Sequence, residues 1–437
     1  MSYPDAYEEF KLLNIQDMKE RKRRLKLPVP KHDIQISLWR TLKSFVGKDL
    51  TKVAIPVHFN EPLTFLQRLS EDLEYSDLLD KASDESITAD MRLMYLTVFS
   101  AIPYACVSRR YSKPFNPMLA ETYELVREDK GYACIAEQVS HHPPITCLHA
   151  EHERWTFWQE YKMESKFRPT YFKVVPTGSV HFKVRHTNEH FSWVKPTTTI
   201  HNIILGQLWN DQEGTVTITN HATGQKACLF FQPYKTTKHY TKIKGEVYDI
   251  DGNVVIQIKG DWTSHFQYKH VDSETWTDVW TLETDILEEK KKYWGFSPFS
   301  LQLNEPLEGI APTDSRLRPD QRELEHGRVE EAAEEKLRLE ELQRGRRKAN
   351  KNANPQKHGK QKKQKKVIEK SVDKNHASSD ESDVFEDALE HSGLEVISPR
   401  WFSEYTDPDT QETYHTYHGG YWESKLAEDF STSPNIF

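Results

Sequence analysis

The segment Glu137-Gln138-Val139-Ser140-His141-His142-Pro143-Pro144 places two imidazoles directly before two prolines, after a run typical of a β-strand. Prolines end strands, so we expect the two histidines at the rim of a sheet. Adjacent strand residues face opposite sides, and a distorted strand end would be needed to aim both rings at one anion. From the dipeptide alone, a structural or incidental role for the pair is favoured over a functional one. No third ligand follows at i+3 or i+4, which argues against a metal site here.

A second polar group, Lys113-Pro114-Phe115-Asn116-Pro117, carries a cation and an amide on a loop stiffened by two prolines. The loop could present Lys113 and Asn116 to an anion, or it could simply be a rigid turn. The residue types alone leave both interpretations open.

A third group recurs every four residues on one predicted helix face: Lys336, Glu340 and Arg344. Such spacing forms a ladder of ion pairs worth about 0.3–0.5 kcal/mol each. The same ladder would also hold two cations in place for a phosphate. Composition favours the simple ladder.

The elements between these groups change period along the chain. Charged and apolar residues at helical spacing fill about 35–110, where Leu66, Leu69 and Leu73 share a face and Ser37 could cap an earlier helix. Short β-branched and aromatic runs then alternate with turns at 133–139, 155–158, 180–184, 216–219 and 229–231. A hairpin is predicted across Asp251-Gly252. So many consecutive strands hide their edges best in a closed or nearly closed barrel.

These patterns predict five regions, with a charged segment to residue 30 and a helical part over 31–110. A barrel with a long charged helix fills 111–347, a disordered linker 348–395, and an aromatic tail packing on the barrel 396–437. The run Leu93–Val107 is too short to span a bilayer and predicts a buried helix kinked at Pro103. The long helix is predicted over 320–347.

The composition excludes several classes of protein. The chain has 437 residues, a formal net charge of −8 and 11% aromatic residues, so no global basic excess steers it to nucleic acid. Its four cysteines include no C-x-x-C pair, which fits a reducing compartment. The N-terminus lacks a secretory pattern. The lysine tract in 357–370 lacks interleaved aromatics, and it predicts a solvated linker or an attraction for anionic lipid.

Together the motifs resemble the oxysterol-binding-protein-related family of lipid transfer proteins. Residues 137–144 match its fingerprint, and residues 113–117 match its second motif. The pair Glu335-Lys336 with Gln343-Arg344 is similar to its C-terminal motif. Further similarity lies at 47–52, 60–63 and 312–320, and the resemblance covers about 25–347 and the tail from about 400.

The resemblance implies a β-rich α+β fold: a large, near-complete antiparallel barrel around a lipid tunnel, with an N-terminal lid, N-terminal helices and C-terminal helices. The lid falls on residues 1–30, with Leu27 as a contact for a second lipid. The implied ligand is phosphatidylinositol 4-phosphate, whose head group would be held by seven residues: Lys113, Asn116, His141, His142, Lys336, Glu340 and Arg344. The second lipid would be a sterol or phosphatidylserine, and no cofactor or metal is implied.

The chain departs from the family pattern at Ala120, where the family usually has glycine. If that position needs a positive φ, alanine adds strain; if it needs only a small side chain, little changes. Many relatives also carry an upstream membrane-targeting domain, for which residues 1–30 leave no room. We therefore expect a short form or a fragment.

The acidic segment Val384-Phe385-Glu386-Asp387-Ala388-Leu389-Glu390 resembles the motif by which lipid-transfer proteins bind VAP receptors on the endoplasmic reticulum. The matching positions are Phe385, Asp387, Ala388 and Glu390. The alternative is an ordinary acidic linker with an incidental phenylalanine. This resemblance predicts a cytoplasmic protein that acts peripherally at membranes, including endoplasmic reticulum contact sites.

The leading functional hypothesis is a non-enzymatic carrier that exchanges lipids between membranes. A phosphoinositide-dependent sensor or scaffold is the alternative. A phosphoesterase using His141 and His142 as acid and base would need a nucleophile or metal beside them, and Ser140 is the only obvious neighbour.

Overall fold

The structure is a computed structural model that describes residues 6–31, 55–108, 110–168, 170–203, 208–234, 240–282, 292–353 and 397–437. The helix expected around Ser37 and the acidic motif at 384–390 lie outside these residues. No helix in the described part of the chain is long and apolar enough to cross a membrane.

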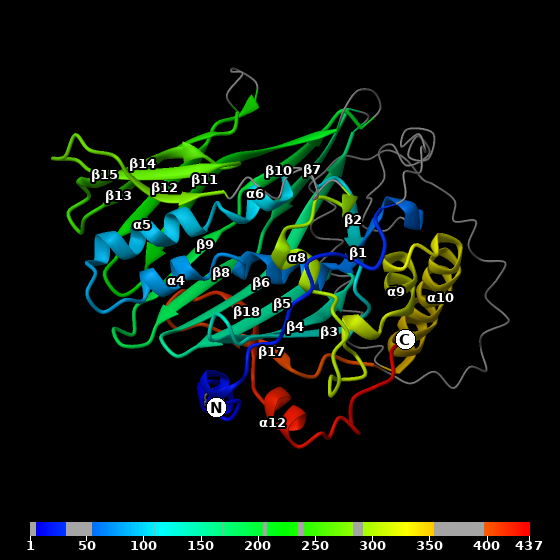
Figure 1. Ribbon diagram of the computed structural model, residues 1–437. Helices are drawn as coiled ribbons and strands as arrows, with labels where there is room; N and C mark the ends of the chain where they lie inside the picture. Colours follow the sequence, from blue (N-terminus) through cyan, green and yellow to red (C-terminus); the bar gives the residue numbers. More distant parts are fainter. Residues whose placement is uncertain are drawn as a thin grey trace.

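The described helices and strands follow in chain order (Figure 1). The helices are α1 (Ala6–Lys11), α3 (Phe65–Ser70), α4 (Asp77–Ala82), α5 (Ala89–Phe99), α6 (Pro103–Val107), α8 (Pro298–Gln302), α9 (Pro319–Glu325), α10 (Val329–Ala353) and α12 (Tyr421–Leu426). The first nine strands are β1 (Asn60–Thr64), β2 (Lys113–Phe115), β3 (Thr122–Arg127), β4 (Tyr132–His141), β5 (Pro144–His152), β6 (Trp155–Phe167), β7 (Tyr171–Pro176), β8 (Ser179–Val184) and β9 (His190–Val194). The others are β10 (Thr197–His201), β11 (Trp209–Asn220), β12 (Lys226–Phe231), β13 (Lys242–Tyr248), β14 (Val254–Asp261), β15 (His265–His270), β16 (Thr277–Thr281), β17 (Phe402–Thr406) and β18 (Thr413–Tyr417).

One large sheet dominates the fold, and 14 strands belong to it within the described residues. The strands run antiparallel in the order β16 to β10, then β7 to β3. The long strands β6 and β11 each accept two partners on one side, so β7 with β10 and β8 with β9 fill the space between them. The sheet curves into a near-complete barrel, which confirms the predicted fold class. The hairpin predicted across Asp251-Gly252 is also confirmed, with Val247 opposite Ile256.

The helices after β1 cover the concave face of this sheet. Helix α3 contacts β3, β4 and β5, while α5 contacts β11 to β14 and β16. The Thr64 hydroxyl accepts from the Gln67 backbone N–H, and the Gln67 side chain accepts from the Thr64 backbone N–H. These two bonds form a capping box that starts α3. Leu66, Leu69 and Leu73 are buried in the main core, as their helical spacing predicts. Burial of this apolar surface holds the helices inside the barrel.

Strand β4 is buried on both faces, which an ordinary barrel strand is not. Its residues Tyr132, Cys134 and Ala136 belong to the interior core. The alternate residues Ala133 and Ile135 belong to a separate outer cluster. Phe10 and Leu13 of the N-terminal segment cover this outer face together with Trp401, Phe402, Tyr417, Tyr421 and Trp422 of the tail. Residues 10–15 and the tail over 401–422 therefore pack against the outside of the barrel.

Two helix predictions were wrong in detail. The expected helix over 320–347 is two helices, because Gly327 adopts a φ of 79° and ends α9. The expected kink at Pro103 is a break: α5 ends at Phe99, and Pro103 opens α6 at its first turn.

Candidate functional site

Lys113 opens β2, which pairs in parallel with β1 so that Asn60 lies opposite it. The Asn60 side-chain amide donates to the carbonyl oxygens of Lys113 at 3.0 Å and Pro114 at 3.3 Å. This fixes the strand that carries the lysine. Burial, and then the nearby Lys336, lower the pKa of Lys113 to about 8, against the opposing effect of Glu340. An anion bound beside Lys113 would therefore stabilise the charged form of this lysine.

The loop after β2 is anchored by a buried arginine that sequence reasoning missed. Arg318 Nη1 donates to the carbonyl oxygen of Asn116 at 2.8 Å and to Glu121 Oε2 at 2.9 Å. The same Glu121 oxygen accepts the Met118 backbone N–H at 2.9 Å. Asn116 itself stays exposed, so its amide faces outward from a braced loop. The signal was present in the family match at 312–320, which gave no role to Arg318.

Ala120 ends this loop in the left-handed region, with a φ of 63°. Its backbone N–H donates to the carbonyl oxygen of Gln138 at 3.0 Å, which ties the loop to β4. Its side chain is buried with Met118 and Leu339. The first of the two alternatives for this position is therefore the correct one: the backbone has the conformation that favours glycine, and alanine is strained there.

The two histidines sit at the end of β4, where the strand pairing is irregular between Gln138 and Ser140. This is the distorted strand end that the pair needs. The rings lie 4.8 Å apart, edge to face, and His141 Nδ1 is 3.2 Å from the carbonyl oxygen of Pro117. Because a carbonyl only accepts, Nδ1 carries the proton. Burial, and then His142, lower the pKa of His141 to about 4.

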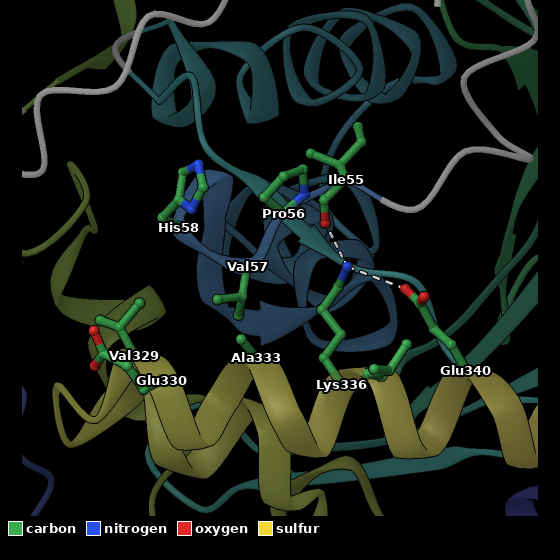
Figure 2. Close-up of a pocket in the computed structure, with 10 residues that line it drawn as sticks. Ile55, Pro56, Val57, His58, Val329, Glu330, Ala333, Lys336 and Glu340 are labelled. Atoms are coloured by element: carbon green, nitrogen blue, oxygen red, sulfur yellow. Dashed lines mark hydrogen bonds and ion pairs between the residues drawn. The ribbon is translucent and has the colours of Figure 1, made fainter. Parts of the chain in front are cut away.

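Helix α10 carries the third motif past this region. Lys336 pairs with Glu340 at 3.1 Å, and Arg344 lies 3.7 Å from the same carboxylate. The ladder of ion pairs therefore exists. Lys336 also donates to the Ile55 carbonyl oxygen, so its ammonium group points away from the helix into a cavity (Figure 2). The Arg344 side chain is 61% exposed and is not drawn into that cavity.

The cavity has a volume of about 330 Å³ and lies between residues 55–58 and α10. Ile55, Pro56, Val57, Ala333 and Leu337 contribute apolar surface, while His58, Glu330, Lys336 and Glu340 contribute polar groups. Figure 2 shows these residues converging from the two segments. Burial, and then Lys336, lower the pKa of His58. His58 was also missed, although it stands two residues before the matched segment 60–63.

The end of α10 joins the motifs together. Gln343 Oε1 accepts the Leu119 backbone N–H at 3.4 Å, and Arg347 acts electrostatically on His141. The structure thus links Lys113, Lys336 and Glu340 in one electrostatic group, and it ties His141 to the braced loop through the Pro117 carbonyl oxygen. Positive charge is concentrated at one rim of the barrel. Such a rim can bind a phosphorylated group whose apolar remainder enters the core.

The first residue of the fingerprint has a separate task. Glu137 is buried on the outer side of β4 and accepts three tail backbone N–H groups: Arg400 at 2.7 Å, Trp401 at 2.9 Å and Phe402 at 3.2 Å. Burial raises the pKa of Glu137 to about 7, against these donors, which favour the carboxylate. Sequence spacing gave no signal for this contact, since it joins residues more than 260 positions apart.

The N-terminal segment is strapped down in the described part. Leu27 is 2% exposed and joins the main core, whereas Leu25 is 74% exposed. Arg23 pairs with Glu128 at 2.5 Å, and Arg24 pairs with Glu325 at 2.5 Å. Glu9 accepts from the backbone N–H groups of Gly420, Trp422 and Glu423 around the start of α12. Phe10 and Leu13 therefore cover the outside of the barrel rather than a tunnel mouth.

An antiparallel barrel packed with internal helices and carrying a cationic rim defines a class of lipid-binding proteins. The sequence profile described as oxysterol-binding protein matches residues 37–426, and the chain belongs to this family. It is 38% identical over 434 residues to oxysterol-binding protein 2 of Mus musculus, covering 95% of this chain and 44% of the relative. It is 43% identical over 334 residues to oxysterol-binding protein-related protein 3 of Mus musculus, covering 75% and 39%.

Solved structures show the same fold. The Osh1 ORD domain in complex with ergosterol is 32% identical, with a TM-score of 0.79 and complete coverage of both chains. The Osh3 ORD in complex with PI(4)P from Saccharomyces cerevisiae is 29% identical, with a TM-score of 0.75, covering 96% of this chain and all of that one. The chain spans less than half of the length of these two curated relatives.

Proposed function

We propose that this protein is a lipid carrier that binds phosphatidylinositol 4-phosphate at the cationic rim and exchanges it for a sterol between membranes. The observation that carries the proposal is the pair of neighbouring cations Lys113 and Lys336, which both interact with Glu340, and of which Lys336 lines the cavity. A phosphate monoester offers the dense negative charge that such partly buried cations favour. The relatives crystallised with ergosterol and with PI(4)P support the same pair of ligands.

The phosphate contacts follow from the donors present. Lys113 and Lys336 supply charge, and the Asn116 amide supplies a neutral donor from the braced loop. His141 donates through Nδ1 to Pro117, so its Nε2 meets a phosphate only after taking up a second proton. A bound phosphate favours that proton uptake. Glu340 holds Lys336 in place, and Arg344 extends the positive surface outward.

The sterol would occupy the apolar interior, with Leu27 as its contact from the N-terminal segment. Leu27 is the residue of that segment that joins the main core in the described range. Phosphatidylserine is the other candidate for the second lipid. The function is binding and transfer rather than phosphate-ester hydrolysis, which a phosphate-release assay on the phosphoinositide would test.

The first experiment is direct. The protein is purified from cells and its bound lipids are identified by mass spectrometry, and the purified protein is then assayed for extraction of phosphatidylinositol 4-phosphate from liposomes. We expect each protein molecule to extract about one molecule of phosphatidylinositol 4-phosphate. Sterol-loaded protein should release its sterol to the liposome as it takes up the phosphoinositide. Failure to extract the phosphoinositide, together with absence of any co-purified lipid, would overturn the proposal.

We also propose that Phe385, Asp387, Ala388 and Glu390 dock on a VAP receptor at the endoplasmic reticulum. An anionic segment is steered to a basic groove and then anchors one aromatic and one small residue. A peptide of residues 376–392 is titrated against the receptor domain, beside the same peptide with Phe385→Ala and Asp387→Ala. Equal binding of the two peptides would show that this segment is only a linker and does not dock on the receptor.

A further inference from the structure

A second group of histidines lies on the outer face of the barrel, far in sequence from the rim motifs. His181 of β8 and His190 of β9 meet Asp407, which follows β17 in the tail. One potential ligand atom from each of the three lies within 4.8 Å of the others. All three residues are buried, and His181 is only 1% exposed. Their neighbours Phe182 and Phe191 face the interior core instead, so the group belongs to the other side of the sheet.

The hydrogen bonds fix the tautomers of both rings. Asp409 Oδ2 lies 3.2 Å from His190 Nδ1, and a carboxylate accepts, so Nδ1 of His190 carries a proton. Nε2 of His190 therefore presents a lone pair, and it faces His181 Nδ1 at 3.0 Å. Nε2 of His181 has no hydrogen-bond partner within the described part of the chain. Nε2 of His181 can therefore take up the ring proton if an ion replaces the hydrogen bond at Nδ1.

The separations suit a small tetrahedral ion. Bonds of about 2.0–2.1 Å to histidine nitrogen place neighbouring ligand atoms roughly 3.3 Å apart. His181 Nδ1 and His190 Nε2 are already 3.0 Å apart and share the Nδ1 proton of His181 in a hydrogen bond. An ion would take the place of this proton, which would move to Nε2 of the same ring, and the two nitrogens need to separate by only a few tenths of an ångström. Two nitrogens and one carboxylate oxygen are a ligand set that zinc favours, and a water would complete the tetrahedron.

The surroundings orient the three ligands. Asp409 holds His190 through its second nitrogen, the arrangement that commonly supports metal-bound histidines. Asp407 accepts from the Tyr414 hydroxyl and from the backbone N–H groups of Asp409 at 2.8 Å and Thr410 at 3.2 Å. Trp158 stacks on His181 with 5.0 Å between ring centres and a 3° interplanar angle. The rings are therefore fixed before any ion arrives.

The local charge also favours a cation. Asp407 and Asp409 supply negative charge, and His221 is the other titratable group against His190. This environment is the opposite of the cationic rim.

A second cluster, Cys147, Glu160 and His415, also lies under the tail but fits a metal less well. Lys162 and His415 already contact the Glu160 carboxylate. Burial raises the pKa of the Cys147 thiol well above its usual value, so the sulfur keeps its proton. The first cluster is therefore the stronger of the two in the described residues.

We propose that His181, His190 and Asp407 bind one zinc ion, which fastens the β17–β18 turn of the tail to strands β8 and β9. The ion would join residues of the barrel wall to a tail segment that also holds Glu137 of the fingerprint strand. Zinc would thus add to the contacts that keep the tail in place.

The test uses the full untagged chain. After dialysis against metal-free buffer, one equivalent of zinc is added, free ion is removed, and retained metal is measured by mass spectrometry. We expect about one zinc per chain, and a thermal unfolding midpoint that rises by about 3 °C or more in excess zinc and falls again with chelator. Magnesium should have no effect, since it prefers oxygen ligands.

Two variants and one control make the outcome specific. His190→Gln and Asp407→Asn should each lose the retained zinc and the thermal shift. The control is His201→Gln, which removes a histidine that also pairs with a carboxylate, Asp211 at 2.9 Å, and stacks on a tryptophan, Trp209, outside the proposed ion site. This control should behave as wild type. Equal zinc retention in all four proteins would overturn the proposal.

Cobalt spectroscopy keeps the proposal testable if a variant fails to fold. One equivalent of Co²⁺ added to the wild-type protein should give the visible absorption of a tetrahedral site, and zinc should displace it. A spectrum of aqueous octahedral cobalt would overturn the proposal regardless of the variants.

Discussion

Two groups of histidines in this barrel have similar burial but opposite charges around them. His141 and His142 lie at the end of β4 at the rim, where Arg318 and Arg347 act electrostatically on His141. His181 and His190 lie under the tail, beside Asp407 and Asp409. Burial lowers the pKa of His141 and His181 alike, so burial does not distinguish the groups. The charges around them do: cations at the rim favour a phosphate, and carboxylates under the tail favour a metal ion.

The strongest way to break this comparison is to remove the rim pair. We expect His141→Ala with His142→Ala to lower phosphoinositide extraction by about 100-fold or more, because two hydrogen bonds to a charged group are worth roughly 1.5–3 kcal/mol each. Zinc retention should not change. Extraction from liposomes is the measurement, with the exposed His186→Ala as control. Wild-type extraction by the folded double variant would remove the histidines from the site.

Reversing a rim charge sharpens the same contrast. Lys336→Ala should weaken head-group binding by about tenfold, the loss of one charge-assisted bond. Lys336→Glu should weaken it by about a further tenfold, because repulsion replaces attraction in a partly desolvated site. Arg338→Glu is the matched control, since Arg338 is an exposed cation on the same helix. If both Lys336 variants lose little or no head-group affinity, Lys336 contributes only to the ion pairs on α10 and does not bind the head group.

A substitution at Glu137 tests whether its hydrogen bonds to the tail stabilise the outer face of the barrel. Glu137→Gln keeps one acceptor oxygen but turns an amide N–H₂ toward a backbone donor, so the free energy of unfolding should fall by about 2 kcal/mol. The tail should also become more sensitive to protease. Urea unfolding measures the first effect, with the exposed Glu404→Gln as control. A tail as protected as in wild type would show that other contacts hold it.

The pH dependence separates a lysine from the histidines at the rim. Lys113 has a pKa of about 8, so it is charged below that pH and neutral above it. Affinity for a phosphoinositide should therefore fall by about tenfold between pH 7 and pH 9. Lys113→Arg should flatten this profile, because arginine keeps its charge throughout. An equally steep profile in the arginine variant would assign the titration to another group.

Local sequence patterns predicted the parts of the fold that depend on local physics. The strand alternation and the turn at Asp251-Gly252 were sufficient to predict a barrel. The alternation of apolar and polar residues shows, within a few residues, which face of each strand is buried. The break at Gly327 was missed because the charged pattern continues on both sides of it. The outer-face position of Phe10 and Leu13 could not be predicted from the sequence, because the pattern of an amphipathic segment does not specify which apolar surface it covers.

The site divides in the same way. The rim motifs were recognisable as short segments, whereas Arg318 and His58 act through contacts that no local spacing reveals. The histidine and carboxylate group under the tail is more extreme, because His190 and Asp409 are 219 positions apart. Only the folded chain brings such residues together.

The smallest expected effect concerns Ala120, at the loop that joins the rim to β4. Its left-handed backbone costs alanine about 1–2 kcal/mol, which glycine would relieve. Ala120→Gly also removes a methyl group buried against Met118 and Leu339, a loss of about 0.8 kcal/mol. It further frees the unfolded chain, at about 0.5–1 kcal/mol. These terms nearly cancel, so the free energy of unfolding should change by less than about 1 kcal/mol. Head-group affinity should stay within about threefold, because Arg318 and Gln343 still hold the loop through Asn116 and Leu119. Urea unfolding and a liposome-binding titration measure both quantities, with Ala222→Gly, an exposed-turn substitution outside the rim, as the control. A gain above about 2 kcal/mol would mean that the strain at this loop is larger than its backbone angle implies.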